Sequence, residues 1–388
     1  MKKYIVFAAA ALVALAACSK VETVDTPDQP VTFQVANYSH QTKADSKFDE
    51  NADFHTYAFF HPVTGDAQWF INNDRVYYHN NAWSPDRTYF WPKTGSVNFF
   101  SYTGSPLPSA MTLATEGTFK YGDASAETPT YVTIATDSDP MVANGAYKYS
   151  NSSANEYSHT YSSPNPTGVP TLLHHLVSKV SFIVKFSAEG ITDTKNKWVL
   201  QINSASLNYA NQGNLTISFI APSTTGQAEW PFAAQAVNWG RNETNTTLSA
   251  TDNLGETNTQ EVVAPNVSDG KTLFNEISVL PQDIRATGSN AKFAINYTLT
   301  HYYDTQDYTA NPDGPAVWTQ QIYETVDLTG DNAIALATKF SNAAISAWNM
   351  NYKYVYTVTI KPNGTVTFDP AVEEWSGTVN SGYTYPEN

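Results

Sequence analysis

Apolar and polar residues alternate in short runs along most of the chain, which is the pattern of half-buried β-strands. Residues 31–35 read Val, Thr, Phe, Gln and Val, and residues 352–360 alternate without interruption. The Pro-Asn-Gly sequence at residues 362–364 favours a hairpin turn, and residues 365–368 predict the returning partner strand. These signals predict an all-β protein with mostly antiparallel strands.

Further runs of this kind are separated by proline, glycine and asparagine residues, which act as turn signals. In the first half the predicted strands are residues 54–60, 68–71, 75–78, 88–91 and 96–102. In the second half they are residues 177–186, 198–209, 215–220, 277–280, 292–303 and 317–326. Asn72 and Asn73 are predicted to end one strand before the next begins. Residues 331–348 are rich in alanine, with apolar residues at helical spacing, and predict one short helix.

Residues 150–168 are predicted to separate two domains, because Ser, Asn, Thr and Pro dominate there and no periodicity is present. A length of 388 residues also favours two domains. We therefore predict two tandem β-sandwich (transthyretin-like) domains, at residues 45–168 and 169–388, with at most one or two short helices.

The start of the chain carries the signals of an exported lipoprotein. Two lysines precede an apolar run over residues 4–17, which is shorter than the roughly 20 residues that span a bilayer. The run ends in Leu-Ala-Ala before Cys18, the only cysteine in the sequence, and resembles a lipobox whose cysteine is diacylated. We predict a signal peptide at residues 1–18, lipid attachment at Cys18, and a tether with an N-terminal strand at residues 19–44. An ordinary signal peptide is the alternative.

Composition excludes several classes of function. A net charge of −15 argues against nucleic acid or an anionic membrane surface as a partner. A single cysteine rules out a disulfide framework and any metal site built from several cysteines. The sequence contains no nucleophile elbow, paired His-Glu motif or phosphate-binding glycine loop. We predict that the protein is not an enzyme and needs no metal or cofactor.

Two clusters resemble metal sites only loosely. His174 and His175 are adjacent on a predicted strand and therefore point to opposite faces, which favours core or edge positions over a shared metal. Asp304, Asp307 and Asp313 lie in one predicted loop but lack the regular oxygen spacing and closing carboxylate of a calcium loop. We expect this loop to be solvated.

Several segments, taken in order, resemble the fimbrillin-like family of Bacteroides and related bacteria, the lipoprotein pilins of type V pili. They include a tryptophan followed by an aromatic-Trp-Pro sequence and a Val-x-Phe-aromatic strand, an Asp-x-Met-x-Ala stretch, and a histidine-containing strand that opens the second half. The matching segments are residues 83–102, 139–143, 173–180, 279–282, 348–356 and 366–375. Together they span most of the chain after the signal peptide.

This resemblance implies a structural subunit of a cell-surface fimbrium that serves adhesion. Such precursors are lipidated and reach the outer membrane surface, where a trypsin-like protease removes the lipid and the first strand. A strand donated by a neighbouring pilin subunit then fills the vacated position. In this sequence the cut is expected between Lys43 and Ala44, while a solvated linker lysine is the alternative. The implied partners are other pilin subunits, the outer membrane through the lipid on Cys18, and a host or bacterial surface ligand. The resemblance leaves open whether the subunit is stalk, anchor or tip.

A surface lipoprotein that binds glycans is the alternative function, since exposed tryptophans can stack on sugar rings. The candidate residues are Trp69, Trp83, Trp91, Trp230, Trp239 and Trp318. Coplanar, exposed tryptophans would favour sugar binding, whereas buried ones would favour the fimbrial subunit, because large aromatic residues in strands usually fill a sandwich core.

Overall fold

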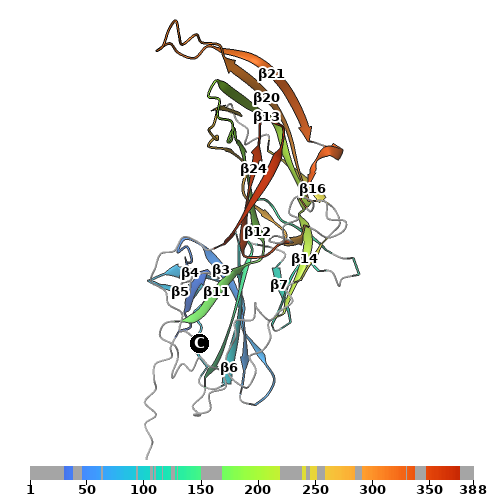
Figure 1. Cartoon of the computed structure of the whole chain (residues 1–388). Helices are drawn as coiled ribbons and strands as arrows, with labels where there is room; N and C mark the ends of the chain where they lie inside the picture. Colours follow the sequence, from blue (N-terminus) through green and yellow to red (C-terminus); the bar gives the residue numbers. More distant parts are fainter. Residues whose placement is uncertain are drawn as a thin grey trace, which may run out of the picture.

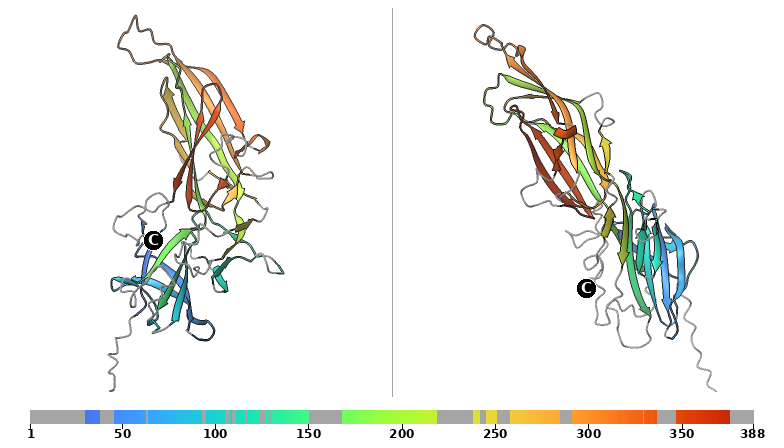
Figure 2. Two further views of the ribbon diagram at one scale, coloured as in Figure 1. Left: turned by 60° about the horizontal axis from the view of Figure 1, so that its bottom comes forward. Right: turned by 90° about the vertical axis from the view of Figure 1, so that its right-hand side faces the viewer.

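The structure is a computed structural model that describes residues 30–37, 46–149 and 168–375. Internal gaps in this description fall at residues 63, 93–94, 105–107, 109–110, 116, 124–126, 129, 219–237, 242–244, 251–257, 285–290, 329 and 337–346. The described part is elongated, with the N-terminal strands at one end and strands β20 (Lys292–Asp304) and β21 (Trp318–Leu328) at the other (Figures 1 and 2).

Nearly all regular structure in the described residues is strand, which confirms the predicted all-β class. The strands of the first half are β1 (Phe33–Asn37), β2 (Ser46–Lys47), β3 (Asp53–His61), β4 (Gln68–His79), β5 (Ala82–Pro85), β6 (Gly95–Thr103), β7 (Met111–Thr115), β8 (Thr118–Tyr121), β9 (Val132–Thr133) and β10 (Met141–Tyr149). Those that follow are β11 (Val169–His175), β12 (Ser178–Phe186), β13 (Asn196–Ala210), β14 (Gln212–Ser218), β15 (Asn238–Arg241), β16 (Asn245–Ser249), β17 (Thr259–Val263), β18 (Lys271–Val279), β19 (Gln282–Asp283), β22 (Ile334–Ala335), β23 (Ala347–Trp348), β24 (Tyr352–Ile360) and β25 (Val366–Glu374).

The first half forms a sheet that closes on itself. Its strands follow the order β11-β10-β6-β3-β4-β5-β1, and β1 also pairs with β11 to complete the ring. The pairing of β1 with β11 is parallel, whereas the other pairings in this ring are antiparallel. The apolar core inside the ring includes the aromatic residues Phe33, Phe48, Phe54, Trp83 and Phe99.

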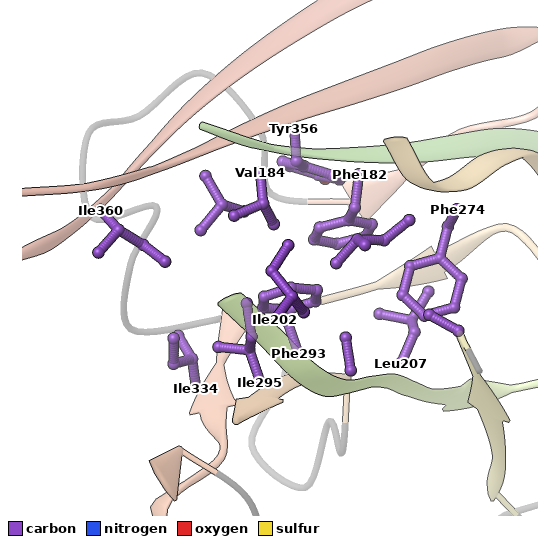
Figure 3. Packing of buried hydrophobic residues seen from close by; sticks show 14 of the residues in the cluster. Phe182, Val184, Ile202, Leu207, Phe274, Phe293, Ile295, Ile334, Tyr356 and Ile360 are labelled. Carbon is purple, nitrogen blue, oxygen red and sulfur yellow. The ribbon is translucent and has the colours of Figure 1, made fainter. Parts of the chain in front are cut away.

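The second half is a two-layer sandwich. One sheet has the order β18-β12-β24-β25 and the other contains β16-β13-β20-β21. Figure 3 shows Phe182 and Tyr356 of the first sheet facing Phe293 and Ile202 of the second. The rings of Phe182 and Phe293 stack with centroids 4.8 Å apart, so the two layers interlock through aromatic side chains.

A third core joins the two halves. Tyr57, Phe100 and Phe119 of the first half pack in one cluster with Leu215 and Trp375 of the second. Strand β14 also pairs with β8, which continues this junction through backbone hydrogen bonds. Alternate residues of β6 therefore serve different cores, and the strand is buried on both faces.

The predicted domain boundary at residues 168 and 169 stays a prediction. Strand β11, which follows it directly, hydrogen-bonds to β10 and β1 and belongs to the ring of the first half. The strands of the sandwich begin only at Ser178.

Three local predictions were wrong: the break between residues 71 and 75, the strand at residues 88–91, and the helix at residues 331–348. Residues 68–71 and 75–78 belong to one strand, β4, because Asn73 adopts a positive φ of 57° at a register shift and does not end the strand. The strand predicted at residues 88–91 is limited to an isolated bridge at Phe90.

The predicted helix at residues 331–348 is wrong at both ends. A 3₁₀ turn occupies Gly330–Asn332, Ile334 pairs with Phe293 on β20, and β23 pairs with β19. Pairing with neighbouring strands overrides the helical tendency of the alanines at these positions. The centre of the predicted helix, residues 337–346, lies outside the described residues.

Candidate functional site

The first described strand, β1, is an integral part of the core. Phe33 and Val35 on this strand, and Val31 two residues before Phe33, are 1–3% exposed, as expected from their alternation with polar residues. The ring of Phe33 makes edge-to-face contacts with Phe54 at 5.4 Å and with Phe99 at 5.7 Å between centroids. Burial of each of these three side chains contributes about 1.5–3 kcal/mol to the free energy of folding.

Backbone hydrogen bonds hold β1 on both sides. Along β11 the two strands run in parallel register from Phe33 opposite Val169 to Asn37 opposite Leu173. The amide N–H of Val169 donates to the carbonyl of Thr32 at 2.7 Å. On the other side β1 pairs with β2 and, through Phe33, with Trp83 of β5.

The segment before β1 contacts Tyr89. The N–H of Val31 donates to the carbonyl of Tyr89 at 2.8 Å, and the phenol of Tyr89 donates to the carboxylate of Asp74 at 2.7 Å. Burial, with the hydrogen bond and negative charge of Asp74, raises the pKa of Tyr89 to about 12. The phenol is therefore a neutral donor at physiological pH.

Gly168 allows the chain to pass close to β1. Its φ is +97°, and a Cβ placed on it would lie 2.8 Å from the carbonyl carbon and 2.9 Å from the amide nitrogen of Phe33. Any larger residue would collide with the β1 backbone as well as adopting an unfavourable φ. Sequence reasoning did not single out Gly168, because its importance comes from a strand that is remote in the sequence.

Removal of β1 would open the ring between β5 and β11. Both strands would then present N–H and C=O groups without their present partners, beside a strip of uncovered aromatic core. We call the faces of β5, β11 and the ring core that contact β1 the β1 site. Such a site has the chemistry to accept an extended strand.

The predicted processing and lipidation residues lie outside the described residues. Cys18, Lys43 and Ala44 therefore stay predictions. In the sequence, Lys43 and Ala44 fall between Asn37, which ends β1, and Ser46, which begins β2. A cut there would separate β1 from the rest of the chain.

His174 and His175 are buried core residues, 3% and 4% exposed respectively. Nδ1 of His175 lies 2.6 Å from a carboxylate oxygen of Asp139, and its ring stacks on Trp375 with centroids 3.9 Å apart. The ammonium of Lys179 lies 4.9 Å from the centre of the same indole ring. This stack spans the junction between the two halves, which gives His175 a structural role that the sequence did not reveal.

The acidic residues around the loop between β20 and β21 differ in exposure: Asp307 and Asp313 in the loop are exposed, whereas Asp304, the last residue of β20, is only 3% exposed. The carboxylate of Asp304 accepts hydrogen bonds from the backbone N–H groups of Gln306 and Val317 and from the phenol of Tyr308. Desolvation alone would raise the pKa of Asp304, but these bonds, with the charge of Lys195, lower it below its usual value. Asp304 thus ties the two ends of the loop together. The loop residues are mostly exposed, as expected, and the prediction was wrong only in placing Asp304 among them.

The tryptophans do not form a common exposed platform among the described side chains. Trp83 is 4% exposed and Trp91 packs edge-on against Phe99, while Trp69 is 53% exposed and lies against Phe59. Trp318 is half-buried, with the ammonium of Lys197 4.9 Å from its ring centre. The side chains of the remaining two candidates, Trp230 and Trp239, are not described.

The described residues show neither a membrane-spanning helix nor a cluster of metal-binding side chains. No helix in the part of the chain that the structure describes is long and apolar enough to cross a membrane. Within the same residues, no three His, Cys, Asp or Glu side chains are grouped as metal ligands.

Comparison with known proteins identifies similar structures but no similar sequence. No protein-family model and no curated protein matches the chain. A fimbrial protein from Bacteroides vulgatus matches with a TM-score of 0.51 and 15% identity over 89% of this chain and 99% of its own. A "putative cell adhesion protein" from Bacteroides uniformis matches with a TM-score of 0.38 and 16% identity over 89% of this chain and 99% of its own. The fimbrial anchor protein Mfa2 from Porphyromonas gingivalis matches with a TM-score of 0.29 and 10% identity over 90% and 98% of the two chains. At 15% identity the first match shows a common fold, and this chain therefore has the fold of a bacterial fimbrial protein, as the resemblance implied.

Proposed function

We propose that this protein is a structural subunit of a cell-surface fimbrium, assembled by strand exchange after its N-terminal segment is removed. It is exported as a lipoprotein anchored through Cys18 in the outer membrane, and cleavage between Lys43 and Ala44 releases it from the lipid. Neighbouring fimbrial subunits are its partners, and the assembled fibre serves adhesion to a host or bacterial surface.

The position of β1 is the observation that carries this proposal. Strand β1, which precedes the proposed cut in the chain, closes the ring of the first half, and Phe33 and Val35 of this strand are buried in the ring core together with Val31 just before it. Its loss would expose unpaired strand edges and apolar side chains, which is a strong driving force for taking up another strand. The fold shared with a fimbrial protein supports the same function.

The glycan-binding alternative is less well supported. Trp83 is used to fill the ring core, and Trp69 is half-exposed without a coplanar tryptophan among the described side chains. A sugar-binding function would also not explain why β1 is buried in the ring.

A cleavage experiment tests the proposal. The chain from residue 19 to residue 388 is treated with a lysine-specific protease, beside a Lys43→Gln variant treated identically. We expect cleavage after Lys43, followed by ordered polymers visible by electron microscopy, in the first sample only. A cleaved chain that stays monomeric at high concentration, or polymers that form equally in the variant, would contradict the proposal.

A further inference from the structure

We propose that the β1 site selects its incoming strand by a three-position pattern, with an aromatic residue at the centre and an aliphatic residue two positions to either side. This inference rests on the strand exchange proposed above and identifies the partner more closely. The partner is an extended segment of another chain with the pattern aliphatic-x-aromatic-x-aliphatic, as in Val31, Phe33 and Val35.

The central position is shaped for an aromatic ring. Phe33 meets Phe54 at an interplanar angle of 81° and Phe99 at 90°, so two aromatic residues bracket it edge-to-face. Such contacts add to the stability that comes from burial of area alone, and an aliphatic side chain cannot reproduce them. The backbone of Phe33 also pairs with Trp83, so the position is held from the opposite strand as well.

The flanking residues, Val31 and Val35, are buried, but as aliphatic side chains they form no edge-to-face ring contacts with Phe54 or Phe99. Val31 and Val35 are 1% and 2% exposed, and both belong to the ring core. The intervening residues Thr32 and Gln34 are only half-buried. Side-chain selection therefore acts on every second residue of the strand, as the pleat requires.

Gly168 lies directly against the backbone of the central residue, Phe33. Its missing side chain leaves just enough room for the backbone of Phe33, whose nearest atoms would lie 2.8–3.0 Å from a Cβ. The close contact requires the incoming strand to lie tightly against Gly168, and the alternating side chains set its register, because a shift by one residue would turn the apolar side chains out of the core.

Peptide exchange into the cleaved chain tests the pattern. A fluorescent peptide of residues 30–37 is added to residues 19–388 cut after Lys43, and its fluorescence anisotropy reports binding. Unlabelled competitors carry the native sequence, Phe33→Ala, Phe33→Leu, or Thr32→Ala combined with Gln34→Ala. We expect the Phe33→Ala peptide to compete on the order of 100-fold more weakly than the native one. The Phe33→Leu peptide should be about tenfold weaker, and the double variant should stay within about threefold of the native peptide.

Two glycine variants of the full chain test the backbone contact. Gly168→Ala places a methyl group against the incoming strand, whereas Gly190→Ala imposes similar backbone strain, at a φ of +87°, where nothing lies within 4 Å of the new atom. We expect Gly168→Ala to weaken binding of the labelled peptide by about tenfold or more and Gly190→Ala to leave it unchanged. The peptide series uses the unmodified chain, so it tests the pattern even if a glycine variant folds poorly.

The outcomes separate the two proposals. If all peptides compete equally, the cleaved chain exchanges strands but does not select them, and only the three-position pattern is overturned. If no peptide of any sequence binds the cleaved chain, strand exchange itself fails and the pattern fails with it. Ranked competition that follows the central aromatic residue supports both.

Discussion

At the scale of single residues, buried tyrosine hydroxyls differ in whether they have a partner. The hydroxyl of Tyr356 accepts a hydrogen bond from the indole N–H of Trp348 at 2.6 Å, whereas the buried hydroxyl of Tyr297 has no hydrogen-bond partner among the described residues. We expect Tyr297→Phe to stabilise the protein by about 1 kcal/mol, since it removes an unpaired polar atom from the core. Tyr356→Phe should destabilise it by about 1–3 kcal/mol, since it leaves the indole N–H unpaired. Urea unfolding of both variants measures the difference, and equal effects would refute this account.

Alkaline pH provides a second test at this scale. Burial raises the pKa of Tyr209 to about 12 and, with the charge of Glu324, that of Tyr297 to about 12 as well. An unfolded tyrosine loses its proton near pH 10. The stability linked to these residues is therefore complete below pH 10 and is lost as the pH rises from 10 to 12. Stability measured by urea unfolding between pH 9 and 11.5 should fall less steeply in the double variant Tyr209→Phe, Tyr297→Phe. Parallel curves for the two proteins would contradict the prediction.

At the scale of elements, β1 is held in the ring by the side chains that it directs into the core. Phe33→Ala removes a ring that contacts Phe54 and Phe99, and we expect a loss of about 3–5 kcal/mol in the stability of the uncut chain. Thr32→Ala is the matched control at the residue directly before β1, because its side chain is half-buried and its carbonyl keeps the hydrogen bond from Val169. Thermal unfolding should show a loss for the control of less than about 1 kcal/mol. Similar losses for both variants would mean that β1 is not held by its core-facing side chains.

At the scale of the whole molecule, the junction between the two halves determines whether they unfold together. Trp375 belongs to the core shared by both halves and stacks on His175 of the ring. We expect Trp375→Ala to lower stability by about 3–5 kcal/mol and to split a single calorimetric transition into two. The half-exposed Trp69 offers a control, since Trp69→Ala should cost about 1 kcal/mol and preserve the single transition. Two transitions already present in the unmodified chain would contradict the coupling.

Most strands were predictable from the sequence because alternation identifies which residues of a strand face a core. Residues 352–360 and the turn at 362–364 form the predicted hairpin, with Gly364 at a φ of +73°. Local signals failed where distant contacts override them. Asn73 forms a bulge within a strand, and the alanine-rich stretch after Gly330 pairs with strands at both of its described ends.

Alternation of apolar and polar residues alone predicted the all-β class and a common buried face for Val31, Phe33 and Val35. The lipobox pattern predicted lipid attachment at Cys18, and the family resemblance implied cleavage after Lys43. The parallel pairing of β1 with β11, the closure of the ring and the close approach of Gly168 became known only from the fold. The physical reason is that side-chain periodicity specifies the face a strand buries, whereas its partner depends on contacts between residues far apart in the chain.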